Sequence, residues 1–152
     1  MIIQVIGLPC LGKTTLIKEQ QPYLSDYEII DMRDFNSGWN VSADLEVLSA
    51  LINAYQEGKK NFIIESVYGF SSIKSFNIEL YSTSNDYWLN NIVLRHGSKA
   101  YKHIPIYQAY KDNPLDIKAK AERFDVSNPF ERYKASCYMH TLLIPPDNME
   151  YK

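Results

Sequence analysis

Near its amino terminus the chain carries the stretch Gly7-Leu8-Pro9-Cys10-Leu11-Gly12-Lys13-Thr14. It follows the pattern G-x-x-x-x-G-K-[ST], in which glycines let the backbone approach a phosphate closely and a helix begins at the lysine. The apolar run MIIQVI at residues 1–6 comes directly before it and is typical of a strand buried on both faces. Strand, glycine-rich turn and helix in this order predict a phosphate-binding loop, or P-loop, at residues 7–14.

The residue types of this loop predict what it binds. Backbone N–H groups at the helix start would face phosphate oxygens, Lys13 would add a positive charge, and the Thr14 hydroxyl would reach Mg²⁺. We therefore expect ATP and Mg²⁺ as cofactors. The residues expected to bind them are Gly7, Leu8, Pro9, Cys10, Leu11, Gly12, Lys13, Thr14 and Thr15.

Further segments alternate between strand and helix patterns. Strands are predicted at 1–6, 27–30, 61–64, 76–81 and 141–144. Helices are predicted at 13–21, at 42–56 with Ser42 as cap and Gly58 as stop, at 86–96, and after the cap Asn128. This order predicts an α/β fold, a three-layer P-loop NTPase sandwich with a mainly parallel five-stranded sheet and a small lid, in a single domain over residues 1–152.

Composition narrows the classes of protein. The 152 residues carry a net charge of −2, which argues against a broad nucleic-acid-binding surface. Residues 1–90 hold six basic and eleven acidic side chains, whereas residues 91–152 hold ten and seven, so an anion would favour the second half. With two distant cysteines, no signal-peptide pattern and no apolar run of about 18 residues, we expect a cytoplasmic protein without a membrane span.

Acidic residues follow the second predicted strand. In parallel sheets ligands bind beyond the carboxyl ends of the strands, which places Asp31 near the P-loop. A carboxylate there could act as the general base for an attacking hydroxyl, with Asp34 as the alternative base and a turn-capping role as the alternative for Asp31. Arg33 is either a substrate clamp or a solvated loop charge.

Two further residues complete the expected site. Glu65 ends the third strand and could hold magnesium, fix the acceptor, or serve a capping or surface role. Arg95 begins the basic stretch RHGSKAYKH, which predicts a lid at about 95–128 with His96 and His103 as polar lid residues. Arg95 would stabilise charge in the transition state, or else complement the dipole of its helix.

Over about residues 1–112 the sequence resembles the polynucleotide 5′-hydroxyl kinase group of the P-loop kinases. The motifs that carry this resemblance are GLPCLGKTT, IIDMRDF, IIES and YWLNNIVLRHGSKAYKHIPIYQAYK. The resemblance implies Lys13 and Thr14 for phosphate and magnesium, and Asp31 or Asp34 as base. It further implies Glu65 as the group that orients the acceptor and Arg95 as a lid residue.

Beyond residue 112 the sequence resembles nothing we recognise. Basic and aromatic residues of this region, together with Tyr107 and Tyr110 before it, could line a substrate groove or simply form charged faces over a core. Those of the region itself are Lys118, Lys120, Arg123, Phe124, Arg132, Tyr133 and Lys134.

Three functions remain open at this stage. The first is a kinase for a hydroxyl of a nucleic acid, nucleotide or nucleoside, including a DNA or RNA end. The second is a kinase for another small hydroxylated metabolite, and the third is an ATP-binding regulatory module.

Overall fold

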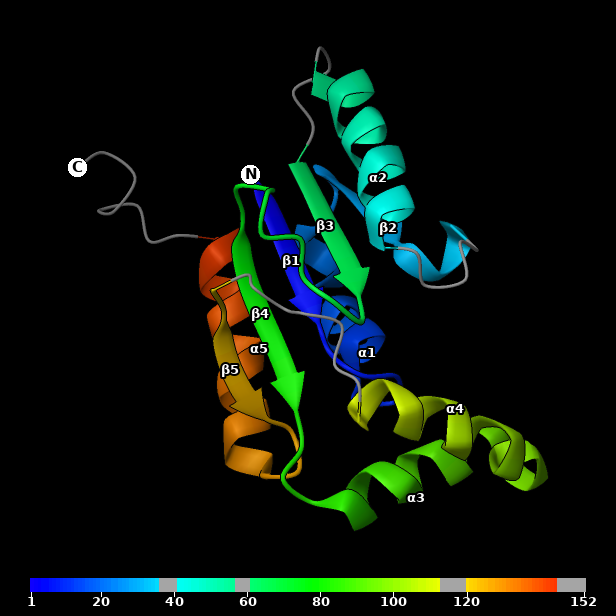
Figure 1. The fold of residues 1–152 in the computed structure, drawn as a ribbon. Coiled ribbons are helices and arrows are strands. Elements are labelled where there is room, and N and C mark those ends of the chain that lie inside the picture. Colours follow the sequence, from blue (N-terminus) through cyan, green and yellow to red (C-terminus); the bar gives the residue numbers. More distant parts are fainter. Residues whose placement is uncertain (36–40, 57–60, 113–119, 145–152) are drawn as a thin grey trace.

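A five-stranded sheet forms the centre of the described chain, and all its neighbouring strands are parallel (Figure 1). This computed structural model describes residues 1–35, 41–56, 61–112 and 120–144. The strands are β1 (Ile2–Ile6), β2 (Tyr27–Asp31), β3 (Asn61–Ser66), β4 (Phe76–Tyr81) and β5 (Glu122–Asp125). Their order is β2-β3-β1-β4-β5, so β1 is central and the P-loop follows its carboxyl end.

An α-helix follows every strand except β3, which leads to β4 without a helix between them, and two α-helices follow β4. The helices are α1 (Lys13–Glu19), α2 (Val41–Gln56), α3 (Asn85–His96), α4 (Ala100–Asp112) and α5 (Pro129–Leu143), with short 3-10 turns at Gln21–Tyr23, Met32–Phe35 and Gly97–Lys99. In Figure 1, α3 and α4 lie beyond the arrowheads of the strands. None of the helices within the described ranges is both long and apolar enough to cross a membrane.

Buried side chains pack on both faces of the sheet. On one face, α1, α3 and α5 contribute apolar side chains to a core that includes Ile63 of β3. On the other face, Leu48 of α2 packs in a cluster with Phe62 and Ile64 of the same strand. Because successive residues of a strand point to opposite faces, β3 serves both cores, and the result is the expected three-layer α/β arrangement.

A buried glutamine fastens the chain that follows β3. The Gln4 side chain donates to Phe70 O (3.0 Å) and accepts from Phe70 N (2.8 Å), and it also donates to the Ser75 hydroxyl (2.7 Å). These bonds satisfy a polar group that the apolar run of β1 would otherwise bury unpaired. They also hold the segment 67–75 against the central strand.

Four of the five predicted strands are confirmed, and β4 has the predicted bounds. The fifth prediction was wrong, because residues 141–143 continue α5 and Ile144 is its carboxyl-terminal cap. The observed β5 pairs with β4, and Arg123 lies directly opposite Glu79 and forms an ion pair with it. This strand depends on cross-strand partners about 44 positions away, which leave no local pattern in the sequence.

The start of α2 and the extent of the predicted lid also differ from the predictions. Helix α2 begins at Val41, so Ser42 lies inside its first turn and is not the cap; its predicted stop, Gly58, lies outside the described residues. The predicted lid at 95–128 is wrong at its carboxyl end, because β5 belongs to the sheet. The part of it before residue 113 forms the end of α3, a 3-10 turn and α4.

Candidate active site

The P-loop has the backbone geometry that its glycines predict. A Cβ atom at Gly7 would lie 2.7 Å from Leu80 O, so only glycine fits where the loop leaves β1 beside β4. Gly12 has φ +86° at the amino-terminal cap of α1, in the left-handed region that favours glycine. Cys10 also has a positive φ, +67°, which is uncommon for a residue with a side chain.

Helix α3 holds the loop from one side. The Trp88 indole N–H donates to Pro9 O (2.7 Å), and the Asn91 amide donates to Cys10 O (3.1 Å). One turn further, Arg95 Nη1 lies 3.9 Å from Cys10 Sγ. Trp88 and Asn91 were not predicted from the sequence, although their i, i+3, i+7 spacing with Arg95 places the three on one helix face.

Lys13 is buried within the loop that it is expected to serve. Its ammonium group donates to Gly7 O (2.5 Å) and Leu8 O (3.0 Å). Burial lowers the pKa of Lys13 to about 8, although the Glu65 carboxylate acts in the opposite direction. A phosphate beside this ammonium would stabilise its charged form.

Thr14 and Glu65 meet across the cleft. The Thr14 hydroxyl donates to Glu65 Oε1 at 2.5 Å, and Glu65 is only 6% exposed. Magnesium prefers such hard oxygen ligands and commonly uses one or two protein groups together with substrate phosphates and waters. The donor set therefore fits Mg²⁺ bound with a nucleotide, and the described residues include no group of three or more His, Cys, Asp or Glu side chains that would hold a metal alone.

Asp31 faces the same cleft and is paired with Arg33. The Arg33 guanidinium binds both carboxylate oxygens, with Nη2 2.6 Å from Oδ2. Burial would raise the pKa of Asp31, but the hydrogen bonds and charge of Arg33 outweigh it, so the pKa is lowered. Asp31 is thus held ionised. Asp34, the alternative base, is exposed on the following 3-10 turn and is not among the residues that line the cleft.

One cleft of about 900 Å³ gathers most of the expected site residues. Those that line it are Pro9, Cys10, Gly12, Lys13, Thr14, Thr15, Asp31, Arg33, Glu65 and Arg95. Tyr107 of α4 also lines it, and its hydroxyl lies 3.1 Å from His96 Nε2. The His96 ring stacks on His103 at 3.6 Å, so these two histidines interact with each other and with Tyr107.

Several of the residues considered for a basic groove in the carboxyl-terminal region have other partners in the part of the chain that the structure describes. Arg132 of α5 forms an ion pair with Glu19 of α1, and Arg123 pairs with Glu79. Lys134 lies over the ring of Phe130, whereas Lys118 lies outside the described residues. For Arg132 and Lys134 these contacts favour the alternative of charged faces over a core, and the groove stays a prediction.

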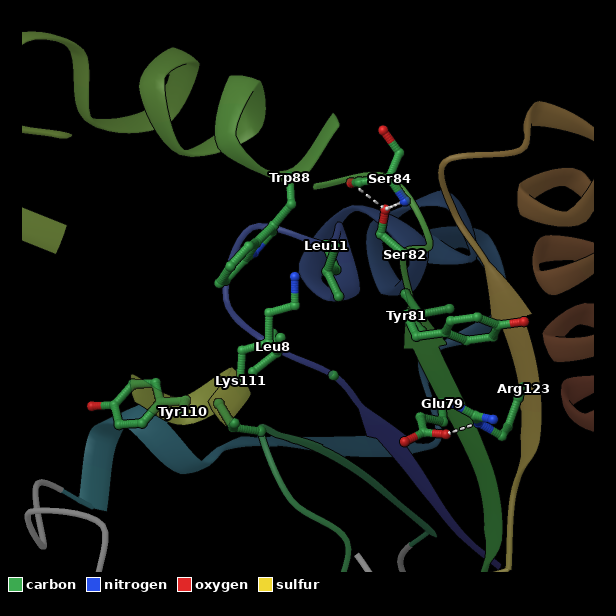
Figure 2. A pocket seen from close by; sticks show the side chains of 13 residues that line it. Leu8, Leu11, Glu79, Tyr81, Ser82, Ser84, Trp88, Tyr110, Lys111 and Arg123 are labelled. Atoms are coloured by element: carbon green, nitrogen blue, oxygen red, sulfur yellow. Dashed lines mark hydrogen bonds and ion pairs between the residues drawn. The ribbon is translucent and has the colours of Figure 1, made fainter. Parts of the chain in front are cut away.

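A second cavity of about 290 Å³ lies on the β4 side of the P-loop (Figure 2), and the sequence analysis did not predict it. Gly7, Leu8 and Leu11 of the loop line this cavity rather than the cleft. Figure 2 shows Trp88 and Lys111 beside the loop, and the Lys111 ammonium lies 5.4 Å from the centre of the indole ring. The Glu79–Arg123 pair closes its far wall.

Comparison with known proteins identifies the fold class. No protein-family model matches the chain, and no curated protein matches its sequence. Solved structures do match over nearly the whole chain, and the kinases among them, together with the P-loop geometry, define an α/β fold of the P-loop kinase type.

The particular neighbours are distant in sequence. A shikimate kinase from Bacteroides thetaiotaomicron matches with a TM-score of 0.55 and 14% identity, over 94% of this chain and 98% of its own. A putative kinase from Chloroflexus aurantiacus matches with 0.55 and 15%, over 91% and 96%. An uncharacterized protein from Eubacterium ventriosum gives 0.56 and 10%, over 96% and 99%. Similarity at such low identity shows the fold alone.

These structures do not support the narrower resemblance to polynucleotide kinases. A chain of an RNA repair complex matches with a TM-score of 0.47 and 16% identity, over 77% of this chain and 46% of its own. That score is too low to carry an argument about the acceptor.

Proposed function

We propose that this chain is an ATP- and Mg²⁺-dependent phosphotransferase that moves the γ-phosphoryl group to a hydroxyl. The observation that carries the proposal is the meeting of Lys13, the Thr14–Glu65 pair and Asp31 in one cleft at the carboxyl edge of the sheet. Phosphoryl transfer needs mainly positioning and charge stabilisation, which these groups can supply.

The nucleotide side of the proposal uses the P-loop. The loop and the start of α1 bind the β- and γ-phosphates, and Lys13 moves its ammonium from the loop carbonyls to phosphate oxygens. Thr14 and Glu65 would hold Mg²⁺, which when bound would supply positive charge against the charge that develops on the transferring group. Arg95 lines the cleft beside Cys10, where a guanidinium can stabilise the charge of the transferring group.

The acceptor side uses Asp31. Its ionised carboxylate orients the attacking hydroxyl and accepts its proton as the new O–P bond forms and the bond between the γ-phosphorus and the β-phosphate oxygen breaks, so that ADP leaves. Since Arg33 now occupies both oxygens of Asp31, a productive complex requires the guanidinium to release one of them, and an anionic group on the acceptor would draw it away.

Two classes of acceptor remain as candidates. A nucleic acid, nucleotide or nucleoside hydroxyl is suggested by the sequence motifs. The ion pairs of Arg123 and Arg132 favour a small hydroxylated metabolite. A nucleic-acid strand would need free basic side chains to contact its phosphates, and these two arginines are already paired with glutamates.

Transfer of labelled γ-phosphate to DNA ends, RNA ends, nucleosides, nucleotides and sugars tests the proposal. Acceptor-dependent transfer is the expected result, and the acceptor that reacts separates the two classes. If phosphate is released from ATP at a rate that no acceptor changes, the protein is instead an ATP-hydrolysing regulatory module.

A further inference from the structure

A buried carboxylate on α2 has no role in the chemistry described so far. Asp44 is only 3% exposed, yet it also lines the cleft that holds Lys13 and Glu65. One of its oxygens, Oδ2, accepts a hydrogen bond from the hydroxyl of Tyr68, which follows β3. The other, Oδ1, is buried and has no hydrogen-bond partner among the described residues.

This arrangement destabilises the fold unless a ligand donates a hydrogen bond to Asp44 Oδ1. Leaving one acceptor of a buried polar group unsatisfied destabilises a fold, and an ionised carboxylate costs more than a neutral group. Burial and the nearby Asp44 carboxylate raise the pKa of Tyr68, so the phenol keeps its proton and donates it to Oδ2. Tyr68 therefore holds the carboxylate in place without satisfying Oδ1.

The topology places Asp44 on the side of the cleft that holds Asp31, the proposed base for the acceptor hydroxyl. In the sheet, β2 and β3 lie on one side of β1, and they carry Asp31 and Glu65 at paired positions. The segments that line the cleft beside them are Asp44 of α2 and residues 66–68 after β3. Arg95 and Tyr107 come from α3 and α4, which follow β4 on the other side of β1.

We propose that Asp44 and Tyr68 form a recognition subsite, in which the Asp44 carboxylate turns toward the cleft when the phosphate acceptor binds and Oδ1 accepts a hydrogen bond from a second donor group of that acceptor. The acceptor then carries at least two donors: the hydroxyl that Asp31 orients, and a further O–H or N–H group seated at Asp44. Vicinal or neighbouring diols, such as those of sugars and ribonucleosides, and amino alcohols have this chemistry. The inference rests on the proposed phosphotransferase function.

Pairs of acceptors that differ by one donor group test the subsite directly. The probes are a ribonucleoside against its 2′- and 3′-deoxy forms, ribose against 2-deoxyribose, and an amino alcohol against the alcohol that lacks the amine. For the wild type we expect kcat/KM to be at least about 10-fold higher for the member with the second donor. In Asp44→Asn that ratio should fall close to one, because the amide group can keep the Tyr68 bond but cannot accept a second donor with its nitrogen.

This ratio separates recognition from a structural role. If Asp44 only supported the fold, its substitution would lower kcat/KM for both members of a pair by the same factor, and the ratio would persist. The thermal midpoint gives a second readout, since removing a buried, half-satisfied charge should leave it equal or higher in Asp44→Asn. Glu46→Gln is the matched control: it removes a carboxylate from an exposed position of the same helix and should change neither quantity.

A second variant tests the subsite even if Asp44→Asn fails to fold. Tyr68→Phe keeps the ring and removes only the hydroxyl, and it should lower the same ratio severalfold because Asp44 loses the bond that orients it. Ratios unchanged in both variants would overturn the inference. So would a wild-type chain that binds Mg·ATP in calorimetry but neither binds nor phosphorylates any of these probes. A chain that fails to bind Mg·ATP would instead overturn the proposed function itself.

Discussion

At the scale of single residues, burial decides how the site groups behave. Lys13 and Glu65 are both buried beside the P-loop, whereas Asp31 and Arg33 are only partly covered and pair with each other. A buried lysine loses solvation and with it part of its tendency to stay protonated. The same burial strengthens its interaction with a bound phosphate, because water no longer screens the charges.

The lowered pKa of Lys13 predicts a pH dependence for nucleotide binding. Below pH 8 the ammonium is charged and binding should be constant, whereas above pH 8 it must first take up a proton. The Kd for Mg·ATP should therefore rise about tenfold per pH unit above pH 8, as calorimetry at pH 7 to 10 can measure.

Two substitutions at the same position complete this experiment. Lys13→Arg should give a flat profile over this range, because a guanidinium stays charged. Lys13→Ala should weaken Mg·ATP binding by about 30-fold or more while the protein stays folded. Unchanged affinity in a folded Lys13→Ala protein would rule out the P-loop role.

The choice of base predicts different outcomes for two neighbouring aspartates. Asp31→Asn should retain Mg·ATP binding and lose roughly 10²-fold or more in transfer rate, because the amide cannot accept the hydroxyl proton. Asp34→Asn should lose much less, since Asp34 is exposed and is not among the residues that line the cleft. Rates for both variants under saturating acceptor decide the assignment, and an inactive Asp34 variant beside an active Asp31 variant would reverse it.

At the scale of elements, α3 acts as a support for the P-loop. Two of its side chains hold consecutive loop carbonyls, and a third contacts the side chain of Cys10. A loop that is already ordered loses less entropy when it binds phosphate. Trp88 should therefore increase the affinity for the nucleotide although it does not contact the nucleotide itself.

Trp88→Phe tests this support. Phenylalanine keeps most of the apolar packing but removes the N–H group that binds Pro9 O, a loss of about 1 kcal/mol for one hydrogen bond. The Kd for Mg·ATP should rise about fivefold, measured by calorimetry. Val93→Ala, at an exposed position of the same helix, serves as control and should leave the Kd unchanged. Equal affinity in Trp88→Phe would mean that the loop holds its shape without α3.

At the scale of the whole molecule, the sheet order brings distant segments to one edge. The P-loop, the end of β2, the start of α2, the end of β3 and the helices α3 and α4 all line the cleft. The segment 67–75 contributes Val67 and Tyr68 to this cleft, and Gln4 fastens that segment to the central strand. Stability and site geometry are therefore linked through Gln4.

Gln4→Leu should be destabilising for this reason. Leucine has a similar size but leaves the N–H and C=O groups of Phe70 without their partner, which costs about 1–3 kcal/mol for each group that water cannot reach. Chemical denaturation should show a loss of about 2–6 kcal/mol in the free energy of unfolding. Gln21→Leu, at an exposed position, should change it by less than about 0.5 kcal/mol. A similar small change in Gln4→Leu would show that water or local movement satisfies Phe70.

The sequence by itself determined the P-loop, its neighbouring strand and helix, four strands of the sheet and the α/β class. These features arise from local causes: glycines where the backbone needs left-handed or crowded positions, apolar runs of strand length, and an asparagine-proline start for α5. The expectation that Thr14 and Glu65 could both serve magnesium also had a local basis, because Glu65 lies at the carboxyl end of one parallel strand and Thr14 follows the end of another.

Only the tertiary structure decided the fifth strand, the support of the loop by α3 and the place of Asp44 in the cleft. Each depends on a partner far along the chain: Glu79 for Arg123, Pro9 for Trp88, and Tyr68 for Asp44. Hydrogen bonds and ion pairs between such residues form after the sheet order has brought them together, so they follow from topology and leave no periodic pattern in the sequence.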